Sequence, residues 1–229
     1  MKNQISPRRM TSLLLVGILG CILMGGSDWL MIYGDPTYKG ELAWLTLGVA
    51  GIAPGRNALS LLLAFPAVIC YSFALFAVKR FLTRDGDRHT YSMLTTLGLT
   101  PWLCIHLFYV MILYLFAWML GNGAQDMAYA ACEALFRQFR WIIPLGEVLM
   151  LLPFVYLLVQ TVRGKSVFPR WAALNHPLLH YVVLKLLISL MPDTAFGLAF
   201  TNGLMSEAML LWFVGFILLI PRYYRPEAR

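Results

Sequence analysis

Long apolar stretches separated by short polar segments occupy most of the chain. They lie at about residues 11–33, 58–78, 98–120, 141–162, 174–191 and 204–220. A helix needs about 20 predominantly apolar residues to cross the hydrocarbon core of a bilayer. The pattern therefore predicts an all-α fold: a polytopic bundle of six transmembrane helices that forms one integral membrane domain over residues 1–229.

Two further segments, at 41–53 and 124–140, are partly apolar but do not have the character of a membrane span. The first is too short to cross a bilayer, and the second has apolar residues at helical spacing with charges between them. We expect a short interfacial helix in each of these external loops. Pro101 is expected to bend the third helix or to mark the start of its membrane crossing.

The basic residues are concentrated at the two termini and in the gaps after the second and fourth stretches. They are Lys2, Arg8, Arg9, Lys79, Arg80, Arg84, Arg88, Arg163, Lys165, Arg170, Arg222, Arg225 and Arg229. The other gaps hold far fewer. Because short cytoplasmic loops carry an excess of Lys and Arg, this pattern predicts that both termini are cytoplasmic.

Composition changes this picture little. The chain has 60% hydrophobic and only 13% charged residues, so the spans leave no room for a separate soluble domain. Its net charge of +7 lies in loops expected to meet anionic headgroups. No basic face is interleaved with aromatic residues, so nucleic acid is not an expected partner. The lipid bilayer is an expected partner, and the sequence is also consistent with a homo-oligomer.

Ionisable side chains within or beside the spans are the main functional signal. At the centre of a membrane helix, Asp, Lys or Arg costs about 2.5 to 3.5 kcal/mol, so such groups are expected to face the bundle interior. Lys185, near the middle of the fifth stretch, is expected to pair with Asp28 or Glu147. The candidates, most of them in the predicted outer half, are Asp28, His106, Glu147, Lys185, Asp193 and Glu207.

Three classes of function are consistent with such a group. The first is binding or transport of a small or amphiphilic ligand, a lipid included, in an outer polar pocket formed by Asp28, His106, Glu147, Lys185 and Glu207. The second is an intramembrane hydrolase that uses Asp28, His106 and Glu147 with a metal or an activated water. The third is a structural or assembly partner whose polar groups fix helix register. The sequence identifies neither the ligand nor a cofactor.

His176 and His180 form an H-x-x-x-H pair on one predicted helix face, a spacing that can supply two metal ligands. The pair resembles the last helix of intramembrane metal hydrolases that include the alkaline ceramidases. Those families place a Ser, an Asp and a His on the same side of the membrane as the pair. Here the pair is predicted at the cytoplasmic end and Asp28 toward the outside, so no metal site is assigned.

The first span contains the run Gly25-Gly26-Ser27-Asp28-Trp29-Leu30, followed by Gly34-Asp35-Pro36. This run is similar to the first helix of an uncharacterised group of small six-span bacterial membrane proteins. The resemblance implies a bacterial inner-membrane location and implies no activity.

Overall fold

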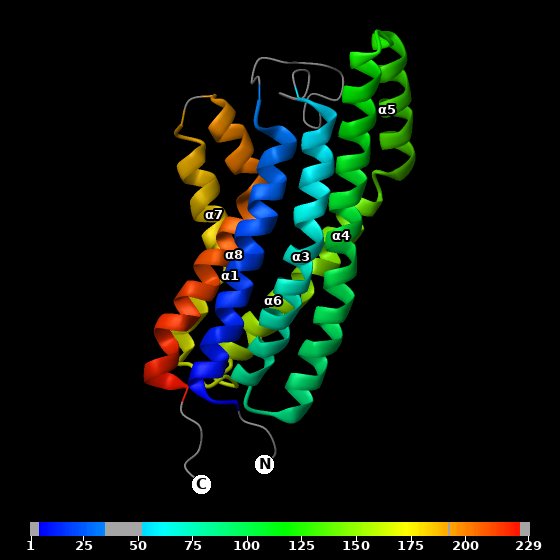
Figure 1. Cartoon of the computed structure of the whole chain (residues 1–229). Helices are drawn as coiled ribbons and strands as arrows, with labels where there is room; N and C mark the ends of the chain where they lie inside the picture. Colours follow the sequence, from blue (N-terminus) through cyan, green and yellow to red (C-terminus); the bar gives the residue numbers. More distant parts are fainter. Residues whose placement is uncertain (1–4, 35–51, 192, 225–229) are drawn as a thin grey trace.

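The structure is a computed structural model that describes residues 5–34, 52–191 and 193–224 (Figure 1). In these ranges the chain is helical and forms no strand, which confirms the all-α prediction. The helices are α1 (Pro7–Ile32), α3 (Pro54–Val78), α4 (Asp85–Gly121), α5 (Gln125–Phe139), α6 (Ile142–Val162), α7 (Pro177–Ile188) and α8 (Ala195–Tyr223), with 3-10 turns η1 (Lys79–Phe81) and η2 (Arg170–Leu174).

Within the described ranges, five helices are long and apolar enough to cross a membrane: α1, α3, α4, α6 and α8. The span expected at 174–191 is instead the 12-residue helix α7, preceded by η2. At 1.5 Å per residue α7 is about 18 Å long, short of the roughly 30 Å hydrocarbon core. The expected six-span plan thus has five full-length helices and one short one.

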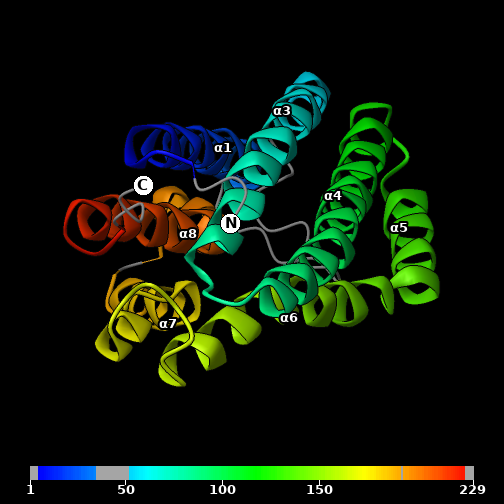
Figure 2. The same cartoon turned by 90° about the horizontal axis from the view of Figure 1, so that it is seen from below.

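The membrane-length helices and α7 are arranged around a common centre (Figure 2). Neighbours pack in the order α7, α8, α1, α3, α4 and α6, and η2 contacts α6. The start of α1 and the end of α8 meet at one end of the bundle, where the Tyr224 hydroxyl donates to the Ile5 carbonyl over 3.2 Å. We call this the terminal end.

Close approach of α1 to α3 depends on small residues. A Cβ at Gly20 would lie 3.0 Å from the Ala67 carbonyl oxygen, and Ala74 packs in the same way against Gly17. Small residues at such contacts let backbones approach closely, which is how apolar helices gain packing energy in lipid.

Helix α4 continues unbroken through Pro101 from Asp85 to Gly121, so the span expected at 98–120 is the later part of a longer helix. The expected interfacial helix at 124–140 is α5, but it runs alongside the far end of α4 (Figure 1). Cys132 on α5 is buried against α4, its thiol donating to the Ile112 carbonyl over 3.8 Å. Burial raises the pKa of this thiol to about 11. Most of the helix expected at 41–53 lies outside the described residues.

Candidate functional site

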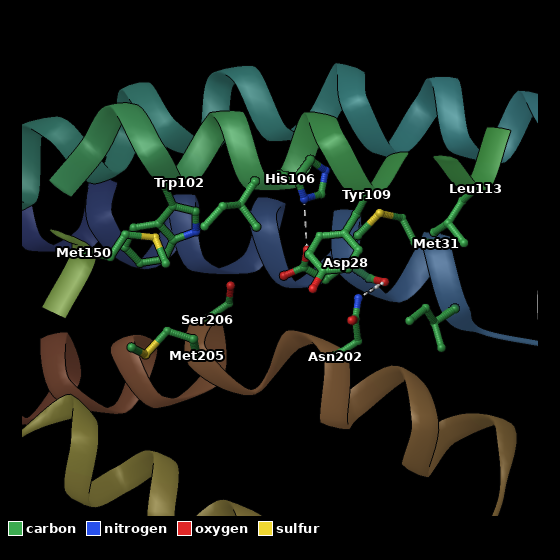
Figure 3. A pocket seen from close by; sticks show the side chains of 12 residues that line it. Asp28, Met31, Trp102, His106, Tyr109, Leu113, Met150, Asn202, Met205 and Ser206 are labelled. Atoms are coloured by element: carbon green, nitrogen blue, oxygen red, sulfur yellow. Dashed lines mark hydrogen bonds and ion pairs between the residues drawn. The ribbon is translucent and has the colours of Figure 1, made fainter. Parts of the chain in front are cut away.

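A pocket of about 260 Å³ lies between α1, α4, α6 and α8 (Figure 3). Its lining comes from the end of α1, the middle of α4 and the early turns of α8, so it occupies the half of the bundle away from the terminal end. The polar lining residues are Asp28, His106, Tyr109, Asn202 and Ser206, and the apolar ones are Met31, Ile32, Trp102, Ile105, Leu113, Met150 and Met205.

Three consecutive residues of α1 point to three different neighbours, because successive side chains on a helix are about 100° apart. Ser27 is fully buried and meets α3, where its hydroxyl bonds to Ser60. Asp28 points into the pocket toward His106 (Figure 3). Trp29 packs edge-on against Phe196 of α8, with 5.4 Å between ring centroids. The α1 run thus joins three helices around one polar group.

His106 is the centre of the polar wall. It is buried, with 4% of its surface exposed. Its Nε2 lies 2.8 Å from the Ser27 hydroxyl and 3.3 Å from the Ser60 hydroxyl. Its Nδ1 lies 3.1 Å from Oδ1 of Asp28, whose side chain is 16% exposed. Both ring nitrogens therefore have partners, and the imidazole is fixed between the two serines and the carboxyl group.

The directions of these hydrogen bonds follow from the two serines. The Ser27 hydroxyl lies 2.6 Å from the Ser60 carbonyl oxygen, and the Ser60 hydroxyl lies 2.8 Å from the Ser27 carbonyl oxygen. A carbonyl oxygen only accepts, so each hydroxyl proton points to a carbonyl. Nε2 of His106 must then donate its own proton to Ser27.

One further proton lies between His106 and Asp28. Nδ1 and Oδ1 are at hydrogen-bond distance and cannot both be acceptors. The pair is therefore either imidazolium with carboxylate or neutral imidazole with carboxylic acid. In both cases it carries one shared proton, has no net charge and faces the pocket.

The rest of the polar lining is also held in place. The Asn202 amide donates to the Asp28 carbonyl over 3.0 Å (Figure 3). The Tyr71 hydroxyl donates to Ser206 over 3.2 Å, and the Tyr71 ring packs on Trp102 with 5.0 Å between centroids. Tyr71 thus supports two lining residues, Ser206 and Trp102, without lining the pocket itself.

Glu207 lies behind this wall, between α1 and α8, and does not line the pocket. Its Oε1 accepts from Nε1 of Trp29 over 2.9 Å. Gly203 makes room for the contact, since a Cβ there would lie 2.7 Å from the same oxygen. Oε2 of Glu207 is buried without a hydrogen-bond partner among the described residues. The structure thus assigns Glu207 a place at the helix interface.

Three other candidates lie away from the pocket lining. Glu147 is exposed near the start of α6. Asp193 is exposed before α8. The expected ion pair of Lys185 with Asp28 or Glu147 is wrong: Lys185 is exposed in the last turn of α7, with its ammonium 5.9 Å from the centre of the Tyr181 ring. Because α7 is short, Lys185 lies near a helix end, where a cation complements the helix dipole.

His176 and His180 have structural partners. Nδ1 of His176 accepts from the Leu178 amide over 3.3 Å and caps α7, and Nε2 donates to the Phe154 carbonyl over 3.0 Å. His180 donates from Nε2 to Asn175 over 3.0 Å. Both nitrogens of His176 are thus occupied. In the described part of the chain, no three His, Cys, Asp or Glu side chains are placed to hold a metal ion.

Sequence reasoning did not select Ser60 or Asn202, although both touch the Asp28–His106 pair or its backbone. A local signal was present for each. Ser60 follows Asn57 by three residues in an otherwise apolar span, and Asn202 precedes Ser206 by four. These spacings place each polar pair on one helix face.

No curated protein and no solved structure matches the chain. A family model does match, over residues 1–223, and its description is Family of unknown function (DUF6796). Because this match covers nearly the whole chain, the protein belongs to the DUF6796 family.

Proposed function

We propose that the protein binds a small amphiphile with a cationic or hydrogen-bond-donating head in the pocket beside Asp28. The observation that carries this proposal is the hydrogen-bonded pair of His106 and Asp28, with Nδ1 and Oδ1 3.1 Å apart, on one wall of an otherwise mainly apolar pocket. Ligand sites combine apolar walls with a few convergent polar groups, and this pocket has that composition.

The charges of the lining favour a cation over an anion. Asp28 is the one carboxyl group among the lining residues, which include no Lys or Arg. An ammonium head could pair with the Asp28 carboxylate while the shared proton leaves. Its apolar tail would contact side chains such as Met31, Leu113 and Met205. Binding is then coupled to proton release, which is the property needed for proton-linked transport of the same ligand.

We further propose that the terminal end faces the cytoplasm of a bacterial cell and that the pocket lies in the outer half of its inner membrane. The charge distribution supports this orientation. Arg8, Lys79, Arg84 and Arg163 belong to the terminal end, whereas Arg56, near the start of α3, is at the other. Cytoplasmic loops are enriched in such residues.

Titration of purified protein in a neutral detergent with octylamine, octanol and octanoate tests the ligand class. We expect octylamine to bind at least about tenfold more tightly than octanoate, with a change in tryptophan fluorescence because Trp102 lines the pocket. Calorimetry in two buffers of different ionisation enthalpy is expected to detect the released proton.

The Asp28→Asn variant is expected to lose this preference for octylamine. Asp126→Asn is the matched control, since Asp126 is exposed in the first turn of α5. Equal binding of the three probes to the wild-type chain, or unchanged octylamine binding by Asp28→Asn, would contradict the proposal.

A serine hydrolase is the second candidate, because Ser27, His106 and Asp28 are linked in the order of a catalytic triad. The hydrogen-bond directions disfavour it. A nucleophilic serine donates its proton to the imidazole, whereas Ser27 donates to the Ser60 carbonyl and is fully buried. A fluorophosphonate probe separates the two candidates: labelling that disappears in Ser27→Ala would establish the hydrolase, and we expect no labelling.

A further inference from the structure

A second cavity lies at the terminal end, between the start of α1 and the end of α3. Its volume is about 300 Å³. Three cations line it: Arg9 of α1, with Lys79 and Arg80 of η1. No acidic residue is among its lining residues. We call it the basic cleft.

The three cations have no anionic partner within the described ranges. The ion pairs there are Arg88–Asp85, Arg137–Glu133 and His106–Asp28, and none includes a residue of the basic cleft. Lys79 contacts an aromatic ring, with its ammonium 5.8 Å from the centre of Phe76. Three like charges gathered at one place repel one another, so an anion placed among them would be stabilised.

The other side of the basic cleft is apolar and extends along the helices. Leu13 lies one turn beyond Arg9 on α1, and Phe76 and Phe73 lie one and two turns before the cations on α3. Phe73 is 56% exposed. The basic cleft thus has cations at a helix end and an apolar wall that continues along the helix. This arrangement is complementary to a phospholipid, in which a phosphate group is attached to acyl chains.

We propose that the basic cleft binds an anionic phospholipid, with its phosphate among Arg9, Lys79 and Arg80 and an acyl chain against Leu13 and Phe73. Guanidinium groups suit phosphate because they donate several hydrogen bonds in a planar array. Basic pockets between membrane helices are known to bind anionic headgroups. The lipid would fill the seam between α1 and α3 at the level where these helices begin and end.

Native mass spectrometry of delipidated protein with dioleoylphosphatidylglycerol tests the proposal. Dioleoylphosphatidylcholine and inorganic phosphate serve as the other arms. We expect one tightly held phosphatidylglycerol that neither phosphatidylcholine nor phosphate displaces. The triple variant R9Q/K79Q/R80Q is expected to weaken its binding on the order of 100-fold.

The control triple variant is R84Q/R163Q/K165Q, which removes the same charge from the terminal end outside the basic cleft. Equal weakening by both triple variants would mean that the attraction is diffuse, and displacement by inorganic phosphate would mean a site for a free anion. Either result overturns the proposal. If R9Q/K79Q/R80Q does not fold by circular dichroism, R80Q alone is compared with R84Q in the same way.

Discussion

Asp28 and His106 show how a costly residue restricts its own surroundings. An ionisable group inside a membrane helix must reach a partner or water, and these two satisfy each other across α1 and α4 over 3.1 Å. Ser27 and Ser60 both hold Nε2 of His106, so its Nδ1 is directed to Asp28 at the pocket. A single residue pair thereby sets both the charge and the location of the candidate site.

Gly17 tests the packing that holds α1 in this register. In Gly17→Ala, the new Cβ would overlap Cβ of Ala74 and lie 2.9 Å from the Phe213 ring. We expect a loss of about 1–3 kcal/mol in the free energy of unfolding, measured by thermal unfolding in detergent. Gly26→Ala is the matched control on the same helix, since nothing lies within 4 Å of a Cβ there. Equal stability of the two variants would contradict the packing account.

Some of the site residues could be predicted from the sequence. They are the ones with ionisable side chains, which are costly to place in lipid. Asp28 and His106 were expected to converge because isolation in lipid is expensive for them. Ser60 and Asn202 gave no comparable signal, because hydroxyl and amide side chains are common at membrane helix contacts. For Lys185, the sequence indicates the cost of placing its ammonium in lipid but not the depth of the residue in the membrane, because that depth depends on where the helix starts and ends.

At the level of the helices, α7 is shorter than its apolar stretch in the sequence indicates. Its apolar stretch looks long enough in sequence, but His176 and Pro177 start the helix late and the preceding residues form η2. Asn175 holds this break against α8, donating to the Trp212 carbonyl over 3.1 Å and accepting from His180. Hydropathy records apolar content, whereas the break depends on one local hydrogen bond to Asn175 and one long-range hydrogen bond from it to Trp212.

Two variants of this segment are expected to differ in stability. Asn175→Ala removes both hydrogen bonds and leaves the Trp212 carbonyl and His180 without these contacts, so we expect a loss of about 1–3 kcal/mol. Lys185→Met is expected to change stability by less than about 0.5 kcal/mol, because Lys185 is exposed and has no ion pair among the described residues. Thermal unfolding of both variants in detergent gives the comparison. A loss of stability in Lys185→Met as large as that in Asn175→Ala would mean that the Lys185 ammonium has a structural partner, and it would contradict this prediction.

The apolar face of helix α5 is covered by another helix and not by the headgroups. Its apolar positions predict a face toward the headgroups, but α4 extends far enough beyond the pocket to cover them. Ala128 and Cys132 are both fully buried on the α5 face toward α4. An amphipathic pattern identifies an apolar face, and it does not specify whether lipid or another helix covers that face.

Across the whole molecule, the two proposed sites lie toward opposite ends of α1. The pocket beside Asp28 is near the end of α1, and the basic cleft is near its beginning. A lipid in the basic cleft would therefore contact the α1–α3 pair that also positions Ser27 and Ser60. The two sites share a scaffold but no lining residue, so each can be altered separately.

Cysteine labelling of intact bacterial cells tests the orientation of the whole molecule. In a chain whose native cysteines are replaced by alanine, Asp85→Cys places a thiol at the terminal end, where the Asp85 side chain is 94% exposed. Asn122→Cys places one at the opposite end, beside the start of α5. We expect a membrane-impermeant maleimide to label Asn122→Cys in intact cells and Asp85→Cys only after permeabilisation, because the excess of Lys and Arg at the terminal end is retained in the cytoplasm. Labelling of both variants in permeabilised cells controls for thiol reactivity, and the reverse pattern in intact cells would place the pocket on the cytoplasmic side.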